Sequence, residues 1–154
     1  MKGYYKHPEL TSSLMGSDGW MRTGDIMLRD EEGYFYMLSR KKNVIKSGGE
    51  NVFCSDVESV IRRHPAVREC LVAGVPDERL GEAVAAVVEL KPGCSLNLKE
   101  LQEHCQQYLS SYKKPLHLEL VDHFDMDDAG KIRRDAVDRL LREKYPTDKN
   151  NKIK

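Results

Sequence analysis

The pattern of apolar and polar positions in the second half of the chain predicts buried strands. Two apolar runs bounded by turn residues, Cys70–Val75 and Ala83–Leu90, are typical of strands covered on both faces, and Pro76–Gly81 would be the loop between them. Leu116–Val121 alternates between apolar and polar positions and predicts another strand. These segments form the core of the predicted sheet.

Two hairpins are predicted earlier in the chain. Ile26–Leu28 and the aromatic-rich Tyr34–Leu38 flank the turn residues Asp30–Gly33, which fits a β-hairpin with a loop of four or five residues. Asn43–Ile45 and Asn51–Phe53 have the composition of short strands on either side of a glycine pair. Both pairs therefore predict antiparallel strands.

Apolar positions three and four residues apart predict three helices. Residues 1–25 are rich in glycine and show no sustained period, so no helix or strand is predicted there. Strands mixed with helices, several of them in hairpin order, favour an α+β fold over a doubly wound sheet. The helices are predicted from Cys54 or Ser55 to His64-Pro65, from about Leu98 to Leu109, and from Ala136 to Tyr145.

Composition excludes several classes of protein. The 25 Lys and Arg balance 25 Asp and Glu, so a chain-wide basic surface for nucleic acid is not expected. No apolar run is as long as a membrane span, and the first ten residues lack the apolar centre of a signal peptide. The four cysteines and five histidines show no ligand spacing, which predicts reduced thiols, a cytoplasmic protein and no metal site.

Cations are nevertheless concentrated in one segment. Arg40, Lys41, Lys42 and Lys46 lie within seven residues and lead into Gly48-Gly49. A solvated basic loop is one interpretation of this cluster. The other is a site that handles the phosphates of a nucleotide or of a thiol cofactor.

Four short motifs occur in a fixed order along the chain. They are Gly19–Asp25, Arg40–Gly49, Gly74–Asp77 with Gly81-Glu82, and Gly130–Ile132. Together they resemble the C-terminal part of the adenylate-forming superfamily, which includes acyl-CoA synthetases, luciferases and the adenylation domains of peptide synthetases. The resemblance extends from Gly3 to about Arg134.

The resemblance implies a division into domains. Residues 1–41 would be the last strip of a large N-terminal AMP-binding domain, ending in a β-hairpin. Residues 42–145 would be the small, mobile C-terminal domain of the acyl-CoA synthetase/luciferase-like fold, with a mixed sheet and about three helices, and residues 146–154 a disordered tail. The family's phosphate loop and its Tyr-Gly-x-Thr-Glu motif do not occur in this sequence. We therefore expect the chain to be incomplete without its N-terminal domain.

The resemblance assigns Asp25 and Arg40 to ATP. A carboxylate can accept hydrogen bonds from both hydroxyls of a ribose, and a guanidinium suits ribose and phosphate oxygens. The alternatives are an aspartate that caps a turn and an exposed arginine in a basic loop.

The same resemblance makes Lys42 the hinge, although Asn43 stands where the family usually has an acidic residue. Lys46 and Ser47-Gly48-Gly49 would form the loop used in thioester formation, with Lys46 supplying positive charge and the glycines allowing a close approach. An ordinary glycine turn between two strands is compatible with this role.

Lys131 is the residue that the resemblance assigns to adenylation. A lysine aimed at the α-phosphate stabilises the charge that develops as pyrophosphate leaves. Phe124–Asp127 stand where the family commonly has Leu-Pro-Arg-Thr, and Asp125, Asp127 and Asp128 are expected to neutralise part of the charge on Lys131. The alternative is a surface lysine before a helix.

These residues together predict part of an AMP-forming acid–thiol ligase, which converts a carboxylic acid and ATP to an acyl-adenylate and then to an acyl-CoA. Mg²⁺ would arrive with ATP and be held mainly by the phosphates and the N-terminal domain. Two alternatives stay open: an adenylation domain that delivers to a carrier protein, and a non-catalytic docking module. The isolated chain is expected to be inactive.

Overall fold

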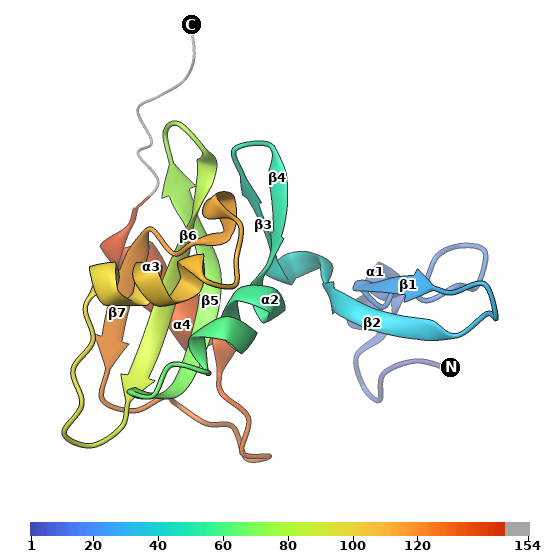
Figure 1. Ribbon diagram of the computed structural model, residues 1–154. Helices are drawn as coiled ribbons and strands as arrows, with labels where there is room; N and C mark the ends of the chain where they lie inside the picture. The colour runs from blue at the N-terminus through green and yellow to red at the C-terminus, as the bar shows by residue number, and fades with distance from the viewer. Residues whose placement is uncertain (147–154) are drawn as a thin grey trace, which may run out of the picture. The chain divides into compact units, whose positions relative to one another are not determined.

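The computed structural model describes residues 1–146 and divides into two compact units, Met1–Lys42 and the part that begins at Asn43 (Figure 1). The division falls one residue after the boundary that the sequence predicts. Residues 147–154, which make up most of the predicted tail, lie outside the described residues.

The first unit contains helix α1 (Pro8–Leu14) and the predicted hairpin, formed by β1 (Asp25–Arg29) and β2 (Phe35–Arg40). The two strands are antiparallel, and the prediction of a hairpin here is confirmed. Helix α1 was not expected, because seven residues with two leucines, Leu10 and Leu14, are too short a segment to show a sustained helical period. It begins at a proline, whose missing N–H costs nothing in the first turn of a helix.

The second unit is a five-stranded mixed sheet with three helices, as expected. The strands are ordered β4-β3-β6-β5, and β7 pairs with β6 in parallel while the other pairs are antiparallel. The strands are β3 (Val44–Ser47), β4 (Glu50–Phe53), β5 (Val67–Asp77), β6 (Gly81–Leu90) and β7 (His117–Val121). The helices are α2 (Cys54–Ile61), α3 (Leu98–Gln106) and α4 (Arg134–Lys144), and the short 3₁₀ turns are η1 (Lys41–Asn43) and η2 (Ser111–Lys113).

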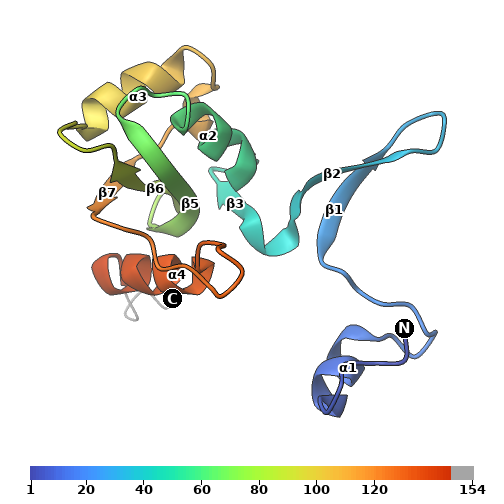
Figure 2. The ribbon, with the colours of Figure 1, turned by 90° about the horizontal axis from the view of Figure 1, so that it is seen from below.

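Strand β6 is buried on both faces. Val84, Ala86 and Val88 pack with α2 and α3, whereas Ala83, Ala85 and Val87 pack with α4. Figures 1 and 2 show α2 and α3 on one face of the sheet and α4 on the other. A strand between two helical layers has no polar face, which explains the continuous apolar run in its sequence.

The turn between β5 and β6 is shorter than predicted. Both strands extend into the segment expected to be a loop, so that only residues 78–80 connect them. Asp77 allows this tight turn, because its carboxylate accepts hydrogen bonds from the backbone N–H groups of Arg79 and Leu80. Pro76 is tolerated because β5 lies at the edge of the sheet, where a missing N–H breaks no ladder.

Helix α3 begins where expected and ends three residues early. Asn97 and Glu100 form a capping box, in which each side chain accepts a hydrogen bond from the other residue's backbone N–H. The helix stops at Gln106, although Leu109 still packs against the core. Helix α4 starts two residues before its predicted first residue. Within residues 1–146, no helix is long and apolar enough to cross a membrane.

The four cysteines are free, and three of them are buried. Burial raises the pKa of the thiols of Cys54 and Cys70 to about 12 and that of Cys105 to about 11. Only thiolates react rapidly with disulfide reagents, so these three thiols should be inert in the folded protein.

We therefore predict that one thiol in four, Cys94, reacts with a disulfide reagent at pH 8 in the native protein. The other three should react only after unfolding in denaturant. Absorbance titration counts the thiols, and Cys94→Ser should remove the rapid phase. Two or more rapidly reacting thiols in the native protein would contradict this prediction.

Candidate functional site

Asp25 and Arg40 are opposite one another at the open end of the β1–β2 hairpin. The Nε atom of Arg40 lies 3.2 Å from Oδ1 of Asp25, whose side chain is 20 % exposed. This oxygen is buried and accepts no well-formed hydrogen bond among the described residues. The hairpin therefore presents a guanidinium beside a carboxylate that retains capacity to accept a hydrogen bond.

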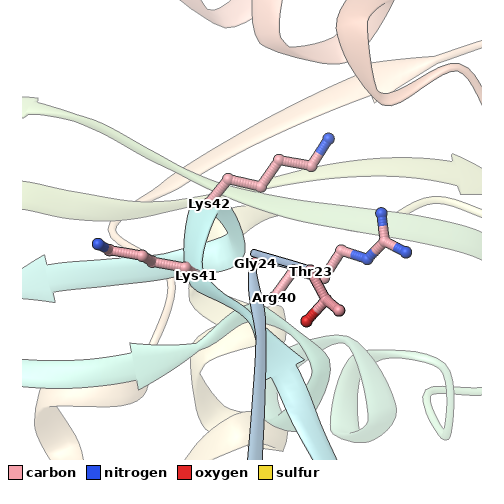
Figure 3. A pocket seen from close by; sticks show the side chains of 5 residues that line it. All are labelled: Thr23, Gly24, Arg40, Lys41 and Lys42. Carbon is pink, nitrogen blue, oxygen red and sulfur yellow. The ribbon is translucent and has the colours of Figure 1, made fainter. Parts of the chain in front are cut away.

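A pocket of about 430 Å³ lies at this end of the hairpin. Figure 3 shows Arg40 and Lys42 extending toward one side of the view and Lys41 toward the other. Gly24 adopts a φ of +75°, and the backbone N–H of Lys41 donates to its carbonyl. The lining residues are Thr23, Gly24, Arg40, Lys41 and Lys42, all from the first unit.

The basic segment continues into η1, where the two units meet in the sequence. Lys42, the predicted hinge residue, is the last residue of the first unit. No strand ladder spans this point, since η1 separates β2 from β3. The segment that includes Lys42 is thus a short turn between two units.

The glycine pair forms the turn of the β3–β4 hairpin. Ser47 pairs with Glu50, and Gly48 and Gly49 have φ values of +59° and +87°, the conformation that a two-residue type I′ turn requires. The Gly48 N–H donates to the Leu80 carbonyl over 2.8 Å. This bond holds the predicted thioester loop against the start of β6.

Lys46 lies on β3 directly before this turn. Its side chain is exposed, and its backbone N–H donates to the carboxylate of Glu82 at 2.6 Å. Ser47 is buried and pairs with Gly81 of β6. Backbone contacts therefore fix Lys46 and Ser47, while the Lys46 ammonium extends to the surface.

A groove of about 310 Å³ adjoins the glycine turn. It contains two cations, Arg79 and Lys114, and the ring of Tyr112. Sequence reasoning missed this groove, because its residues come from segments that only the fold brings together. The lining residues are Ser47, Gly48, Glu50, Arg79, Leu80, Val84, Ser111, Tyr112, Lys114 and Leu116.

Lys131 lies on a small hairpin between β7 and α4. The Asp127 N–H donates to the Lys131 carbonyl over 2.7 Å, and Met126 pairs with Ile132. Gly130 turns the chain with a φ of +73°. The hairpin holds the backbone of Lys131 and leaves its side chain exposed.

The aspartates expected to neutralise part of the charge on Lys131 form no ion pair with it among the described residues. The Asp127 carboxylate instead accepts hydrogen bonds from the backbone N–H groups of Ala129 and Lys131. Among residues 1–146, no carboxylate lies within 4.0 Å of the Lys131 ammonium. Its charge therefore has no protein partner in the described part of the chain.

The glycine turn and the Lys131 hairpin lie at opposite ends of strand β6. The glycine turn contacts Gly81 and Leu80, at the start of β6, whereas the Lys131 hairpin leaves from the end marked by Glu89. Eight residues of strand separate these ends by about 26 Å. Figure 1 shows the β3–β4 turn and the β7–α4 loop at the two ends of the sheet.

No group of three or more potential metal ligands occurs among the described residues. The site residues instead form three groups: the Asp25–Arg40 pair with its pocket, the glycine turn with its groove, and the Lys131 hairpin. Within the second unit, the two loops are not brought together.

Comparison with known proteins gives the family. Residues 56–131 match the model of the AMP-binding enzyme C-terminal domain. Crotonobetaine/carnitine–CoA ligase of Escherichia fergusonii is 39% identical over 136 residues, which cover 88% of this chain and 26% of the relative. The same enzyme of Escherichia coli is 39% identical over 133 residues, or 86% of this chain and 26% of the relative. The chain thus spans about a quarter of the length of these curated relatives.

Solved structures agree with this result. ATP-bound MatB from Rhodopseudomonas palustris matches with a TM-score of 0.81 and 33% identity, over 94% of this chain and 29% of that one. The o-succinylbenzoate CoA synthetase MenE from Bacillus subtilis, in complex with an acyl-adenylate intermediate, matches with a TM-score of 0.77 and 33% identity. The match covers 89% of this chain and 28% of the MenE chain. The chain belongs to the adenylate-forming family of the acyl-CoA synthetase type and matches the C-terminal part of its members.

Proposed function

We propose that the chain supplies the C-terminal machinery of an AMP-forming acid–thiol ligase. A carboxylate attacks the α-phosphate of ATP to give an acyl-adenylate and pyrophosphate, and a CoA thiol then displaces AMP to give a thioester. The observation that carries the proposal is the separation of the Lys131 hairpin and the glycine turn at opposite ends of β6. Two charged loops so far apart suit two reaction steps better than one.

Asp25 and Arg40 would hold the nucleotide. The Asp25 carboxylate is partly exposed, and a ribose hydroxyl could donate a hydrogen bond to it. The guanidinium beside it has N–H donors for ribose or phosphate oxygens. Mg²⁺ would enter with ATP, bound by its phosphates.

Lys131 would serve the adenylation step. Its unpaired ammonium is available to the α-phosphate oxygens, where negative charge is stabilised as pyrophosphate leaves. The backbone bonds of the hairpin hold the Cα of Lys131 in place, which reduces the entropy lost when the side chain engages the phosphate.

The glycine turn and its groove would serve the thioester step. Gly48 and Gly49 leave the backbone open to close approach by an extended thiol arm, and Lys46 brings a cation to the same hairpin. Arg79 and Lys114 suit the phosphates that CoA carries. The groove thus supports CoA as the acceptor.

A change between the two steps requires rotation of the second unit, because its two loops are at opposite ends. Lys42, in the short turn between the units, would absorb the change in backbone dihedral angles. A cytoplasmic location remains a prediction from the pattern of free cysteines.

In the full-length enzyme, Lys131→Ala should lower acid-dependent ATP–pyrophosphate exchange about 10²–10³-fold, the usual loss for one preorganised donor. Thioester formation from a preformed acyl-adenylate should stay within about threefold, because Lys131 acts only in the first step. Lys46→Ala is the matched variant and should show the opposite split. Equal loss of both half-reactions in either variant would contradict the assignment of one loop to each step.

Asp25→Ala should weaken binding of ATP and AMP by about 10–100-fold, since hydrogen bonds to a charged group contribute about 1.5–3 kcal/mol. Calorimetric titration of the full-length enzyme measures the dissociation constants. Asp30→Ala is the control, because Asp30 caps the other end of the same hairpin by accepting from the Tyr34 N–H. Unchanged affinity in Asp25→Ala, or an equal loss in the control, would refute the role of Asp25.

A further inference from the structure

The hairpin that carries Lys131 is closed on itself, so its position depends on how its ends are held. The Arg133 N–H donates to the Asp125 carbonyl over 2.8 Å, in addition to the bonds between Asp127 and Lys131. Residues 125–133 therefore form one small hydrogen-bonded body. Arg134 begins α4 directly after it.

Arg134 ties the C-terminal end of the hairpin to the sheet. One guanidinium nitrogen lies 2.7 Å from Oε1 of Glu58, and the other donates to the Val72 carbonyl over 2.9 Å. Glu58 Oε1 also accepts from the Val72 N–H over 3.0 Å. The pair thus satisfies both backbone groups of Val72 on the outer edge of β5, as a neighbouring strand would.

Glu58 is buried within the apolar face of α2, close to Val57, Val60 and Ile61. A buried carboxylate is costly unless it is paired and hydrogen-bonded. Arg62 approaches Glu58 only to 3.8 Å, so Arg134 is its closer partner. This pairing gives the Arg134 side chain one preferred position, and it thereby also fixes the start of α4.

The N-terminal end of the hairpin is held in the same manner. Phe124 is buried and its N–H lies 3.3 Å from Oε2 of Glu89. Glu89 is itself buried and paired with Arg68 at 2.7 Å. In the described part of the second unit, Glu58 and Glu89 are the two buried carboxylates, and each holds one end of the Lys131 hairpin.

We propose that Arg134 and Glu58 are positioning residues for adenylation, which place the Lys131 hairpin without touching the substrate. This inference rests on the proposed function of Lys131. Two residues, Ile132 and Arg133, separate Lys131 from Arg134. Because the hairpin that contains Lys131 is hydrogen-bonded, a shift at Arg134 displaces the Lys131 backbone. A displacement of about 1 Å at a catalytic group can cost on the order of 10²-fold in rate.

A purely structural ion pair would act on both half-reactions. Asp56 and Lys113 provide the comparison, since they form a 2.9 Å ion pair that joins helix α2 to η2 and includes no residue of the Lys131 hairpin. Loss of this more exposed pair removes an ion pair from the same domain without disturbing the bonds that hold the Lys131 hairpin. Lys113→Gln is therefore the matched control.

The test is Arg134→Gln in the full-length enzyme. Acid-dependent ATP–pyrophosphate exchange should fall about 10–100-fold, and thioester formation from a preformed acyl-adenylate should stay within about threefold. Lys113→Gln should leave the exchange within about twofold of the parent enzyme. Arg134→Lys keeps the charge but lacks the guanidinium fork, so it should fold and show an intermediate loss of exchange.

A double-mutant cycle separates positioning from general stability. If Arg134 acts only through Lys131, adding Arg134→Gln to Lys131→Ala should cause no further loss of exchange. Three results would overturn the proposal. They are additive losses in the double variant, equal loss of both half-reactions in Arg134→Gln, and an exchange rate in Arg134→Gln and Arg134→Lys equal to that of the parent enzyme. If Lys131→Ala itself keeps full exchange activity, the proposed function of Lys131 is wrong. This result distinguishes failure of the proposed function from failure of the positioning role of Arg134.

Discussion

The burial of strand β6 on both faces is the constraint on which the arrangement of this domain depends. Its small and branched apolar residues face α2 and α3 on one side and α4 on the other. A slip of one residue would exchange the two sets of side chains between the helical layers and disturb close packing on both faces. The loops at its two ends are therefore separated by a fixed length of strand, and each keeps its own surroundings.

Charge is arranged around this apolar centre with a clear division of roles. Buried carboxylates, Glu58 and Glu89, have partners and act on the backbone and on arginines. The lysines proposed for the two reaction steps, Lys46 and Lys131, are exposed. Ion pairs thus fix the framework, while the two exposed ammonium groups lie outside it. Under the proposed function, each of them would serve one reaction step.

Local patterns in the sequence predicted the fold well where side chains face a core, as in the apolar run of β6 and the glycine pair of the β3–β4 turn. Helix α1 was missed because it is too short to show a sustained helical period, and the ends of β5 and β6 were missed because the Asp77 cap replaces part of a loop. The motifs supplied the candidate site residues, whose roles stay predictions. The role of Glu58 as a buried ion-pair partner was not predicted, although a carboxylate within an apolar helical stripe indicates such a partner. Its pairing with Arg134, 76 residues away, depends on the tertiary fold.

The account rests on rotation of the second unit between two working positions. Spin labels at Glu31, on the β1–β2 turn, and at Asp128, on the Lys131 hairpin, would report this motion in the full-length enzyme with Cys94 replaced by serine. Pulsed electron resonance should give one distance distribution with ATP and a non-reactive acid analogue, and a second one with a stable acyl-adenylate analogue and CoA. A single distribution common to both states would contradict the account.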